Sequence, residues 1–371
     1  MARSRSVADY FLVGCFFVLL AIPGGLQLIG AGTIGTQENR VLAAPPQMPV
    51  DRATLIALPH KIDAFLDDRF GLRTTLIRWN SMVRLKLGVS SASAVAIGRK
   101  HFLFYAYHPE RLLEQHTGED VYKPAELERW VATAEENRKW LAERGIAYYI
   151  VVAPDKSTIY PEYLPDYPPL PNSTTRLDQL VARLQKSPDL ELIDPRQELR
   201  AAKAEHRIYP YADSHWGPRG AFIAYKMLMD RIRLRFPSAQ PVALDNYDIK
   251  VEPTPGDLAA QLSLYDVLLY PEDGFYWRGK SHQLEVSRIP GKRPWGWPEN
   301  HIKTDLSDKP RLLVQGDSFT DYVMGPLFLY ETFKDPIYTH HNGTTLDYDL
   351  INETHPDIVV LEVAERYLTI P

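Results

Sequence analysis

The chain has 371 residues, of which 45% are hydrophobic and 24% charged, a composition typical of a large globular α/β domain with an additional segment. A net charge of -5 and the lack of a basic stripe argue against a nucleic-acid-binding protein. The single cysteine, Cys15, excludes a disulfide within the chain and a thiolate metal cluster, and we predict neither a metal nor a cofactor.

The N-terminus predicts the cellular location. Arg3 and Arg5 precede an apolar run over 10–31 that is long enough to cross a membrane as one helix. Because positive charge stays on the cytoplasmic side, we predict a cytoplasmic N-terminus over 1–9 and a signal anchor over 10–31. The rest of the chain would then be periplasmic or otherwise extracytoplasmic, held at the inner membrane by a single pass. Cleavage of the run as a signal peptide stays open, and lipidation at Cys15 is a less favoured alternative.

For residues 32–95 we predict a tether followed by helices that pack on the main domain. Apolar residues recur at near-helical spacing over 55–70 and again over 74–87. Two short apolar segments around a Gly-Arg-Lys turn then predict a β-hairpin over 95–105.

Strands and helices alternate through most of the remaining chain. The predicted strands are 146–152, 190–193, 311–315, 336–340 and 357–362. The predicted helices are 124–144, 176–185, 198–206, 218–236, 322–333 and 346–353. This alternation predicts a three-layer α/β/α domain over 96–371, in which helices cover both faces of a mostly parallel sheet. Residues 240–300 lack helical periodicity and predict an insertion of short strands and loops.

The first chemical signal is Gly316-Asp317-Ser318, which lies between a predicted strand and a predicted helix. A serine at such a turn is exposed at the carboxyl edge of the sheet, where backbone N–H groups of the helix favour developing negative charge. The tripeptide alone is a weak signal, because Asp or Ser at this place is also an ordinary helix cap. We predict that Asp317 is that cap.

The second signal is Asp213-Ser214-His215, about a hundred residues earlier. An imidazole can serve as the base for a serine, and a carboxylate two residues before it can fix its tautomer. Taken alone, such a pair in a loop is more often a structural hydrogen bond. Its occurrence together with Gly-Asp-Ser, at the edges of one α/β pattern, predicts a triad of Ser318, His215 and Asp213.

Acyl transfer also needs donors for the oxyanion. The backbone N–H of Ser318 is the first candidate and the side-chain amide of Asn342 the second, although Asn342-Gly343 is equally typical of a turn. The neighbouring His340 and His341 indicate a metal only weakly, because adjacent residues of a strand point to opposite faces.

These paired motifs resemble the SGNH hydrolase-like domain of the alginate O-acetyltransferases, the AlgJ/AlgX group. The resemblance extends over about 38–370. Further matching stretches are Phe70-Gly71-Leu72-Arg73, Gly98 to Tyr105, Val152 to Lys156, Tyr160-Pro161, Pro356 to Val359 and Glu365-Arg366. In this family the Asp-x-His motif precedes the serine, as it does here. The chain departs from the family at Pro154-Asp155-Lys156, where Pro-Asn-Lys is usual. It also ends soon after Arg366, so we expect the membrane-anchored AlgJ type rather than the AlgX type with its C-terminal carbohydrate-binding module.

The resemblance implies an extracytoplasmic O-acetyltransferase that moves acetyl through an acetylated Ser318 onto hydroxyls of an exopolysaccharide, alginate or another polymer. His215 would act as base and then acid, and Asp213 would orient it. A membrane-bound O-acyltransferase is the implied partner that supplies acetyl groups. Candidate substrate-binding residues in the matching stretches are Trp216, Lys156 and Arg366.

Two alternatives stay open. A polysaccharide acetylesterase would use the same triad with water as the acceptor. A non-catalytic polysaccharide-binding or assembly protein would rely on aromatic side chains for sugar stacking, and Tyr276, Trp277, Trp295 and Trp297 fit that use, although packing explains most aromatic residues in any domain. The complete Asp/His/Ser set argues against a pure binder.

Overall fold

The computed structural model describes residues 7–28, 43–69, 71–106, 111–164, 173–278, 285–290 and 298–368. They fall into two compact units, Met1–Ser91 with Ala260–Leu264, and Ala92–Ala259 with Tyr265–Pro371. The candidate tryptophans Trp295 and Trp297 lie outside the described residues.

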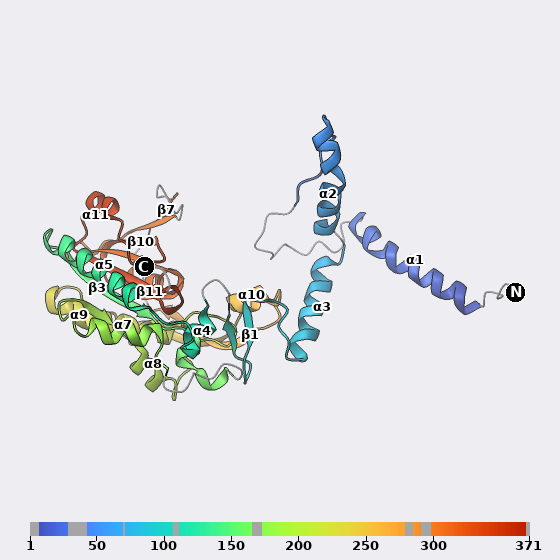
Figure 1. The fold of residues 1–371 in the computed structure, drawn as a ribbon. Helices are drawn as coiled ribbons and strands as arrows, with labels where there is room; N and C mark the ends of the chain where they lie inside the picture. The colour runs from blue at the N-terminus through green and yellow to red at the C-terminus, as the bar shows by residue number, and fades with distance from the viewer. Residues whose placement is uncertain are drawn as a thin grey trace. The chain divides into compact units, whose positions relative to one another are not determined.

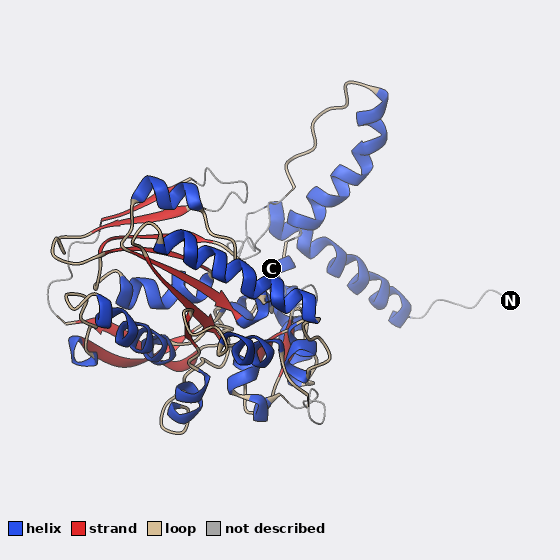
Figure 2. Ribbon diagram, turned by 60° about the vertical axis from the view of Figure 1, so that its left-hand side comes forward, coloured by secondary structure: helices blue, strands red, loops and turns tan. Residues whose placement is uncertain are grey.

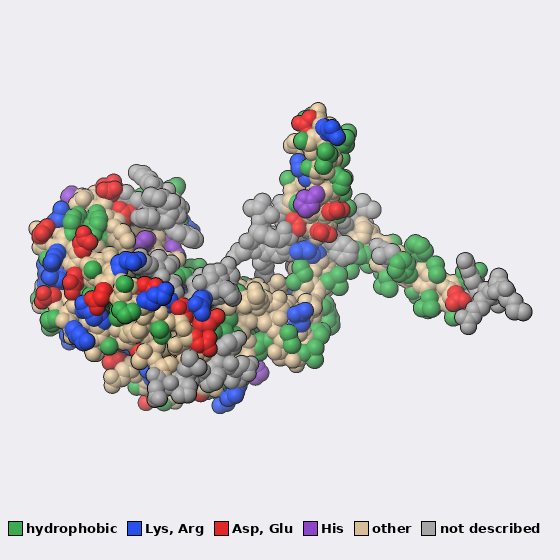
Figure 3. All heavy atoms as spheres, in the orientation of Figure 1, with side chains coloured by type: hydrophobic (Ala, Val, Ile, Leu, Met, Phe, Trp, Pro, Cys, Tyr) green, Lys and Arg blue, Asp and Glu red, His purple; other side chains and the backbone are tan. Residues whose placement is uncertain are grey.

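The first unit begins with the apolar helix α1 (Val7–Leu28), which has hydrophobic side chains on its surface (Figure 3). Its segment Val7–Leu26 has a mean hydropathy of 2.0 and is long and apolar enough to cross a membrane. Helices α2 (Arg52–Arg69) and α3 (Arg73–Lys86) follow and pack on each other. Both agree with the helices predicted from apolar spacing.

The second unit is built on a seven-stranded sheet in the order β4-β3-β11-β9-β10-β8-β7. Its strands are β3 (Ala147–Ala153), β4 (Glu191–Ile193), β7 (Glu285–Ile289), β8 (Glu299–Lys303), β9 (Arg311–Gly316), β10 (Lys334–His340) and β11 (Ile358–Ala364). The first five strands in the order pair in parallel, and β8 and β7 add antiparallel at one edge. The sheet is therefore mixed with a parallel core, as the alternation predicted.

Helices cover both faces of this sheet (Figures 1 and 2). One face packs against α8 (Arg196–Ala202), α9 (Pro218–Arg235) and the π-helix η3 (Thr320–Leu329). The other packs against α5 (Pro124–Ala142), α7 (Arg176–Leu184) and α11 (Tyr348–Thr354). Strand β3 is buried along its whole length and sends alternate side chains into the two cores, because successive residues of a strand point to opposite faces.

Short elements surround this framework. The predicted hairpin is present as β1 (Val95–Ile97) and β2 (Leu103–Tyr105), joined in antiparallel register. The remaining short elements are α4 (Leu112–Thr117), α6 (Lys156–Ile159), β5 (Tyr247–Thr254), α10 (Asp257–Gln261) and β6 (Tyr270–Trp277), of which β5 and β6 form a second hairpin.

Two sequence predictions need correction. The described residues of 240–300 form short strands together with the helix α10, and the last two strands, β7 and β8, extend the main sheet. The helix predicted over 322–333 is a π-helix that begins earlier, at Thr320.

Candidate active site

Ser318 lies where β9 leaves the sheet, at the carboxyl ends of the parallel strands. It is partly exposed, whereas Asp317 and Phe319 on either side of it are buried. Asp317 accepts hydrogen bonds from the N–H of Phe319 (2.9 Å) and from the N–H of Ala364 on β11 (2.7 Å). Asp317 therefore caps the turn, as predicted, and also ties it to the neighbouring strand.

Gly316 is required at this turn by a close approach. A Cβ at this position would lie 2.8 Å from Oε2 and 3.1 Å from Cβ of Glu362. Glu362 is fully buried, and its Oε2 accepts hydrogen bonds from the N–H of Asp317 and the hydroxyl of Thr320, both at 3.0 Å. Burial and the neighbouring charge of Asp317 raise the pKa of Glu362 well above its ordinary value.

The base candidate, His215, reaches this turn from the loop before α9. Its Nε2 lies 2.7 Å from Oγ of Ser318, and its Nδ1 lies 2.8 Å from Oδ1 of Asp213. The backbone N–H of His215 also donates to Oδ1 of Asp213 (2.9 Å). The structure therefore brings all three predicted triad residues into one hydrogen-bonded line.

Asp213 and His215 each shift the pKa of the other. Burial alone would raise the pKa of Asp213, but the hydrogen bond and charge of His215 outweigh it and lower that pKa to about 2. Burial alone would lower the pKa of His215, but the hydrogen bond to Asp213 and the negative charges of Asp213 and Asp257 raise it. The geometry thus favours an ionised carboxylate that stabilises an imidazolium.

The side chain of Trp216, a predicted substrate-binding residue, is buried with 1% exposure and is not open to a ligand in this fold. Its Nε1 donates to the carbonyl of Phe319 (3.0 Å), and the two rings pack edge to face at 5.1 Å. Trp216 thereby joins the loop that carries His215 to the turn that carries Ser318.

Lys156 is also buried rather than open to a ligand. Its Nζ donates to three backbone carbonyls, those of Leu103 (2.8 Å), Tyr211 (2.9 Å) and Asp213 (2.8 Å). Burial lowers the pKa of Lys156 to about 7, while nearby carboxylates and the three acceptors favour its ammonium form. All three donors of the ammonium are used within the protein, so the prediction of substrate binding gives way to a structural role.

Arg366 forms a buried ion pair behind the site. Its Nε donates to Oδ1 of Asp155 (2.8 Å), and Nη2 contacts the same oxygen. Its guanidinium also lies 5.1 Å from the ring of Phe319 and donates to the carbonyl of Ser214 (3.3 Å). Arg366, also a predicted substrate-binding residue, is only 5% exposed, and its contacts join the two loops of the triad.

The oxyanion candidates lie at the same edge of the sheet. Within the described part of the chain, the N–H of Ser318 has no hydrogen-bond acceptor. His340 and Gly316 are register partners, so Asn342 and Ser318 each follow the paired strands by two residues. The side chain of Asn342 interacts with His340. Burial lowers the pKa values of both His340 and His341.

Sequence reasoning missed Asp257, which begins α10 and reaches the triad from the region 240–300. Asp213, His215 and Asp257 present possible ligand atoms within 4.8 Å of one another. Each of these side chains is engaged in a hydrogen bond within the protein. No pattern in the sequence places Asp257 next to the Asp213 loop, because the two segments are more than forty residues apart.

Tyr322, one turn after Ser318, also lies beside the imidazole of His215. Its ring lies 5.1 Å from the ring of His215 and is 64% exposed. Of the stacking candidates within the described residues, Tyr276 is exposed, but its hydroxyl is bound to Glu252.

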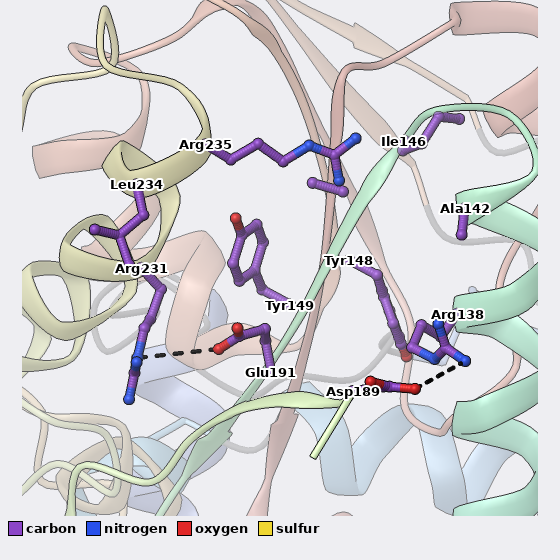
Figure 4. Close-up of a pocket in the computed structure, with 11 residues that line it drawn as sticks. Arg138, Ala142, Ile146, Tyr148, Tyr149, Asp189, Glu191, Arg231, Leu234 and Arg235 are labelled. Atoms are coloured by element: carbon purple, nitrogen blue, oxygen red, sulfur yellow. Dashed lines mark ion pairs between the residues drawn. The ribbon is translucent and has the colours of Figure 1, made fainter. Parts of the chain in front are cut away.

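A cavity of about 330 Å³ lies elsewhere, at the amino ends of β3 and β4 (Figure 4). Its lining includes Arg138 paired with Asp189 (3.6 Å) and Arg231 paired with Glu191 (4.0 Å). In a parallel sheet the amino ends lie at the edge opposite the carboxyl ends. This cavity is therefore separate from Ser318.

The fold and this arrangement define a class: an SGNH hydrolase-like α/β domain with the geometry of a serine acyl-transfer site. Residues 95–273 match the family model described as "SGNH hydrolase-like domain, acetyltransferase AlgX". This segment is therefore similar to the SGNH hydrolase-like domain of AlgX-type acetyltransferases, in agreement with the resemblance that the sequence motifs indicated.

Two curated relatives and one solved structure are also similar to this chain. A probable alginate O-acetylase AlgJ from Pseudomonas syringae pv. tomato is 27% identical over 248 residues, which cover 65% of this chain and 58% of the relative. A probable alginate O-acetylase AlgJ from Pseudomonas fluorescens is 24% identical over 57% of this chain and 53% of the relative. This chain thus spans little more than half the length of the curated relatives it matches. The structure of Bacillus cereus PatB1 with a sulfonyl adduct shares the fold, with a TM-score of 0.50 and 17% identity, covering 67% of this chain and 92% of PatB1.

Proposed function

We propose that the protein is an O-acetyltransferase that carries acetyl on Ser318 and passes it to hydroxyl groups of an extracellular polysaccharide. The observation that carries this proposal is the line from Ser318 Oγ to His215 Nε2 (2.7 Å) and from His215 Nδ1 to Asp213 (2.8 Å). The similarity to alginate O-acetylases supports a polysaccharide as the acceptor and alginate as the first polymer to test.

In the first half-reaction, Oγ of Ser318 attacks the carbonyl carbon of an acetyl donor while its proton moves to Nε2 of His215. The bond between the acetyl carbon and the leaving group breaks, and His215 returns the proton to that group. Asp213 holds the imidazole in the tautomer that leaves Nε2 free to accept. The N–H of Ser318 and the amide of Asn342 are the proposed donors to the tetrahedral oxyanion.

In the second half-reaction, a sugar hydroxyl gives its proton to His215 and attacks the acetyl-serine carbonyl. The ester bond to Ser318 breaks, and Oγ recovers the proton from the imidazolium. Water in place of the sugar hydroxyl would make the same site an acetylesterase. The exposed ring of Tyr322 beside His215 offers a surface on which an acceptor ring could lie.

The proposed location follows from α1. We propose that this helix anchors the protein in the inner membrane by a single pass, with residues 1–9 in the cytoplasm and the catalytic unit outside. An extracytoplasmic acetyl carrier needs acetyl groups brought across the membrane, and a membrane-bound O-acyltransferase is the proposed partner. A topology reporter fused after residue 40 checks the orientation, and a cytoplasmic signal there contradicts it.

Mass spectrometry after exposure to an activated acetyl ester tests the chemistry. We expect one added acetyl group on the peptide that contains Ser318, and no adduct in Ser318→Ala. Adding oligosaccharide acceptors should then remove the adduct and produce acetylated sugar. Acetylation of Ser318→Ala at the wild-type level would overturn the proposal, whereas free acetate without acetylated sugar would establish the esterase.

A further inference from the structure

Asp257 is held against the triad loop by its own backbone. The N–H groups of Leu258 and Ala259 donate to the carbonyl of Ala212 at 3.0 and 3.3 Å. A Cβ on Gly256 would lie 2.1 Å from that carbonyl oxygen, so only glycine permits this approach. The segment 256–259 is thus shaped to bring a carboxylate beside the Asp213 loop.

The side chain of Asp257 then organises that loop. Its Oδ1 accepts from the N–H of Ser214, and its Oδ2 accepts from the hydroxyl of Ser214, both at 2.7 Å. The N–H of Asp257 donates to Oδ2 of Asp213 (3.1 Å), the oxygen that His215 leaves available. Both oxygens of Asp213 are therefore fixed by separate donors.

Asp257 also places a second negative charge beside the imidazole. Its Oδ2 lies 3.9 Å from Nδ1 of His215, compared with 2.8 Å for Asp213. At these distances an opposite charge stabilises the protonated ring. One base is thus flanked by two carboxylates that come from different parts of the chain.

We propose that Asp257 is a positioning residue of the acetyl-transfer site, which orients Asp213 and stabilises the imidazolium of His215 with its own charge. This inference rests on the proposed function. It adds to the Ser–His–Asp line a second carboxylate that is not hydrogen-bonded to the imidazole.

Other charged groups face this cluster and bear on its titration. The negative charge of Asp257 favours the protonated forms of Lys156 and Tyr322. Arg366 approaches Ser214 and opposes protonation of His215. Burial and the charge of Asp213 raise the pKa of Asp257 itself, while the two hydrogen bonds from Ser214 favour its ionised form.

The pH dependence of acetyl-ester turnover tests the proposal. Neutral His215 accepts the serine proton, so turnover rises with pH through the pKa of His215. Asp257→Asn keeps the shape of the side chain and removes its charge. We expect the acid inflection of kcat/KM to move to lower pH by roughly half to one unit, and kcat to fall about tenfold.

Ser214→Ala is the matched control, because it removes one hydrogen bond to Asp257 and keeps the charge. Its turnover should fall without a shift of the inflection, and Asp257→Glu should retain the wild-type inflection. The double variant of Asp213→Asn with Asp257→Asn should lose more activity than the product of the two single losses, because Asp257 no longer substitutes for Asp213. Asp257→Ser serves as the neutral variant if Asp257→Asn does not fold.

Two failures are distinguishable. If wild type turns over, Ser318→Ala does not, and Asp257→Asn keeps the wild-type inflection, the role of Asp257 is wrong and the proposed function stands. The role of Asp257 is also wrong if Ser214→Ala shifts the inflection as much as Asp257→Asn does. If Ser318→Ala is as active as wild type, the proposed function itself is wrong.

Discussion

Two strand-to-helix turns stand at the carboxyl edge of the same sheet and differ in exposure. The β9 turn, residues 316–319, presents a partly exposed Ser318 between buried neighbours. The β3 turn, residues 154–157, also carries an aspartate and a serine, but Asp155, Lys156 and Ser157 are all at most 2% exposed. Similar residues at equivalent strand ends therefore have different surroundings. One turn presents the hydroxyl that we propose as the nucleophile, and the other is buried against the loops around it.

The largest expected effect separates the two turns by activity. Ser318→Ala should reduce acetyl-ester turnover by roughly 10⁴- to 10⁶-fold, because it removes the proposed nucleophile. Ser157→Ala should change turnover by less than about twofold, since the Ser157 hydroxyl is buried and has no hydrogen-bond partner within the described residues. Steady-state kinetics on both variants checks the contrast, and comparable losses would mean that the β3 turn also takes part in chemistry.

The second prediction separates them by stability. Arg366→Ala leaves the carboxylate of Asp155 buried without its ion-pair partner, so the free energy of unfolding should fall by about 3–5 kcal/mol. Ser318→Ala, at a partly exposed position, should change it by less than about 0.5 kcal/mol. Urea denaturation of the two variants measures the difference. Equal stabilities would show that the Arg366 pair does not brace the fold.

A third prediction concerns the close approach under the β9 turn. Gly316→Ala places a methyl group 2.8 Å from the Glu362 carboxyl and should cost about 1–3 kcal/mol of stability together with activity. Gly217→Ala is the control, because a Cβ there meets nothing closer than 3.6 Å. Thermal unfolding and turnover of both variants test this contrast. A Gly316→Ala protein as stable as Gly217→Ala would contradict the packing argument.

The smallest expected effect is a pH dependence of stability that arises at Asp213. Its pKa is about 2 in the folded protein, below the ordinary value, so its contribution is present above about pH 4 and is lost as pH falls toward 2. Between pH 7 and pH 3 this loss should amount to about 1 kcal/mol. Comparing urea midpoints of wild type and Asp213→Asn isolates this group from the other carboxylates. Parallel pH curves for the two proteins would count against the coupling between Asp213 and His215.

Much of the architecture was predictable, because apolar periodicity reports burial directly. Strand β3 is a continuous apolar run, which is typical of a strand whose two faces are both covered by helices. The triad was predictable as well, since Asp-x-His and Gly-Asp-Ser both fell at predicted strand or helix ends. Asp257 was not, because nothing in the sequence shows that 256–259 folds back onto Ala212.

Whereas Asp257 was not predicted, three residues that were predicted to bind substrate turn out to be buried. Lys156, Trp216 and Arg366 are polar or amphipathic residues in the stretches that carry the family resemblance, and such residues are usually at least partly exposed. In the fold, each has its polar atoms bound to backbone carbonyls or to Asp155, and each is at most 5% exposed. Their contacts are with the loops that carry the triad.

The sequence by itself determined the alternation of strands and helices, the long apolar helix at the N-terminus, and the residue types able to carry an acetyl group. Those features depend on local propensity and on periodicity, which are properties of short segments. Only the tertiary structure decided which polar residues face solvent, that Asp257 reaches His215, and that Lys156 is enclosed by three carbonyls. These outcomes depend on contacts between segments tens to hundreds of residues apart, and burial at such contacts decides whether a charge meets a substrate or supports the fold.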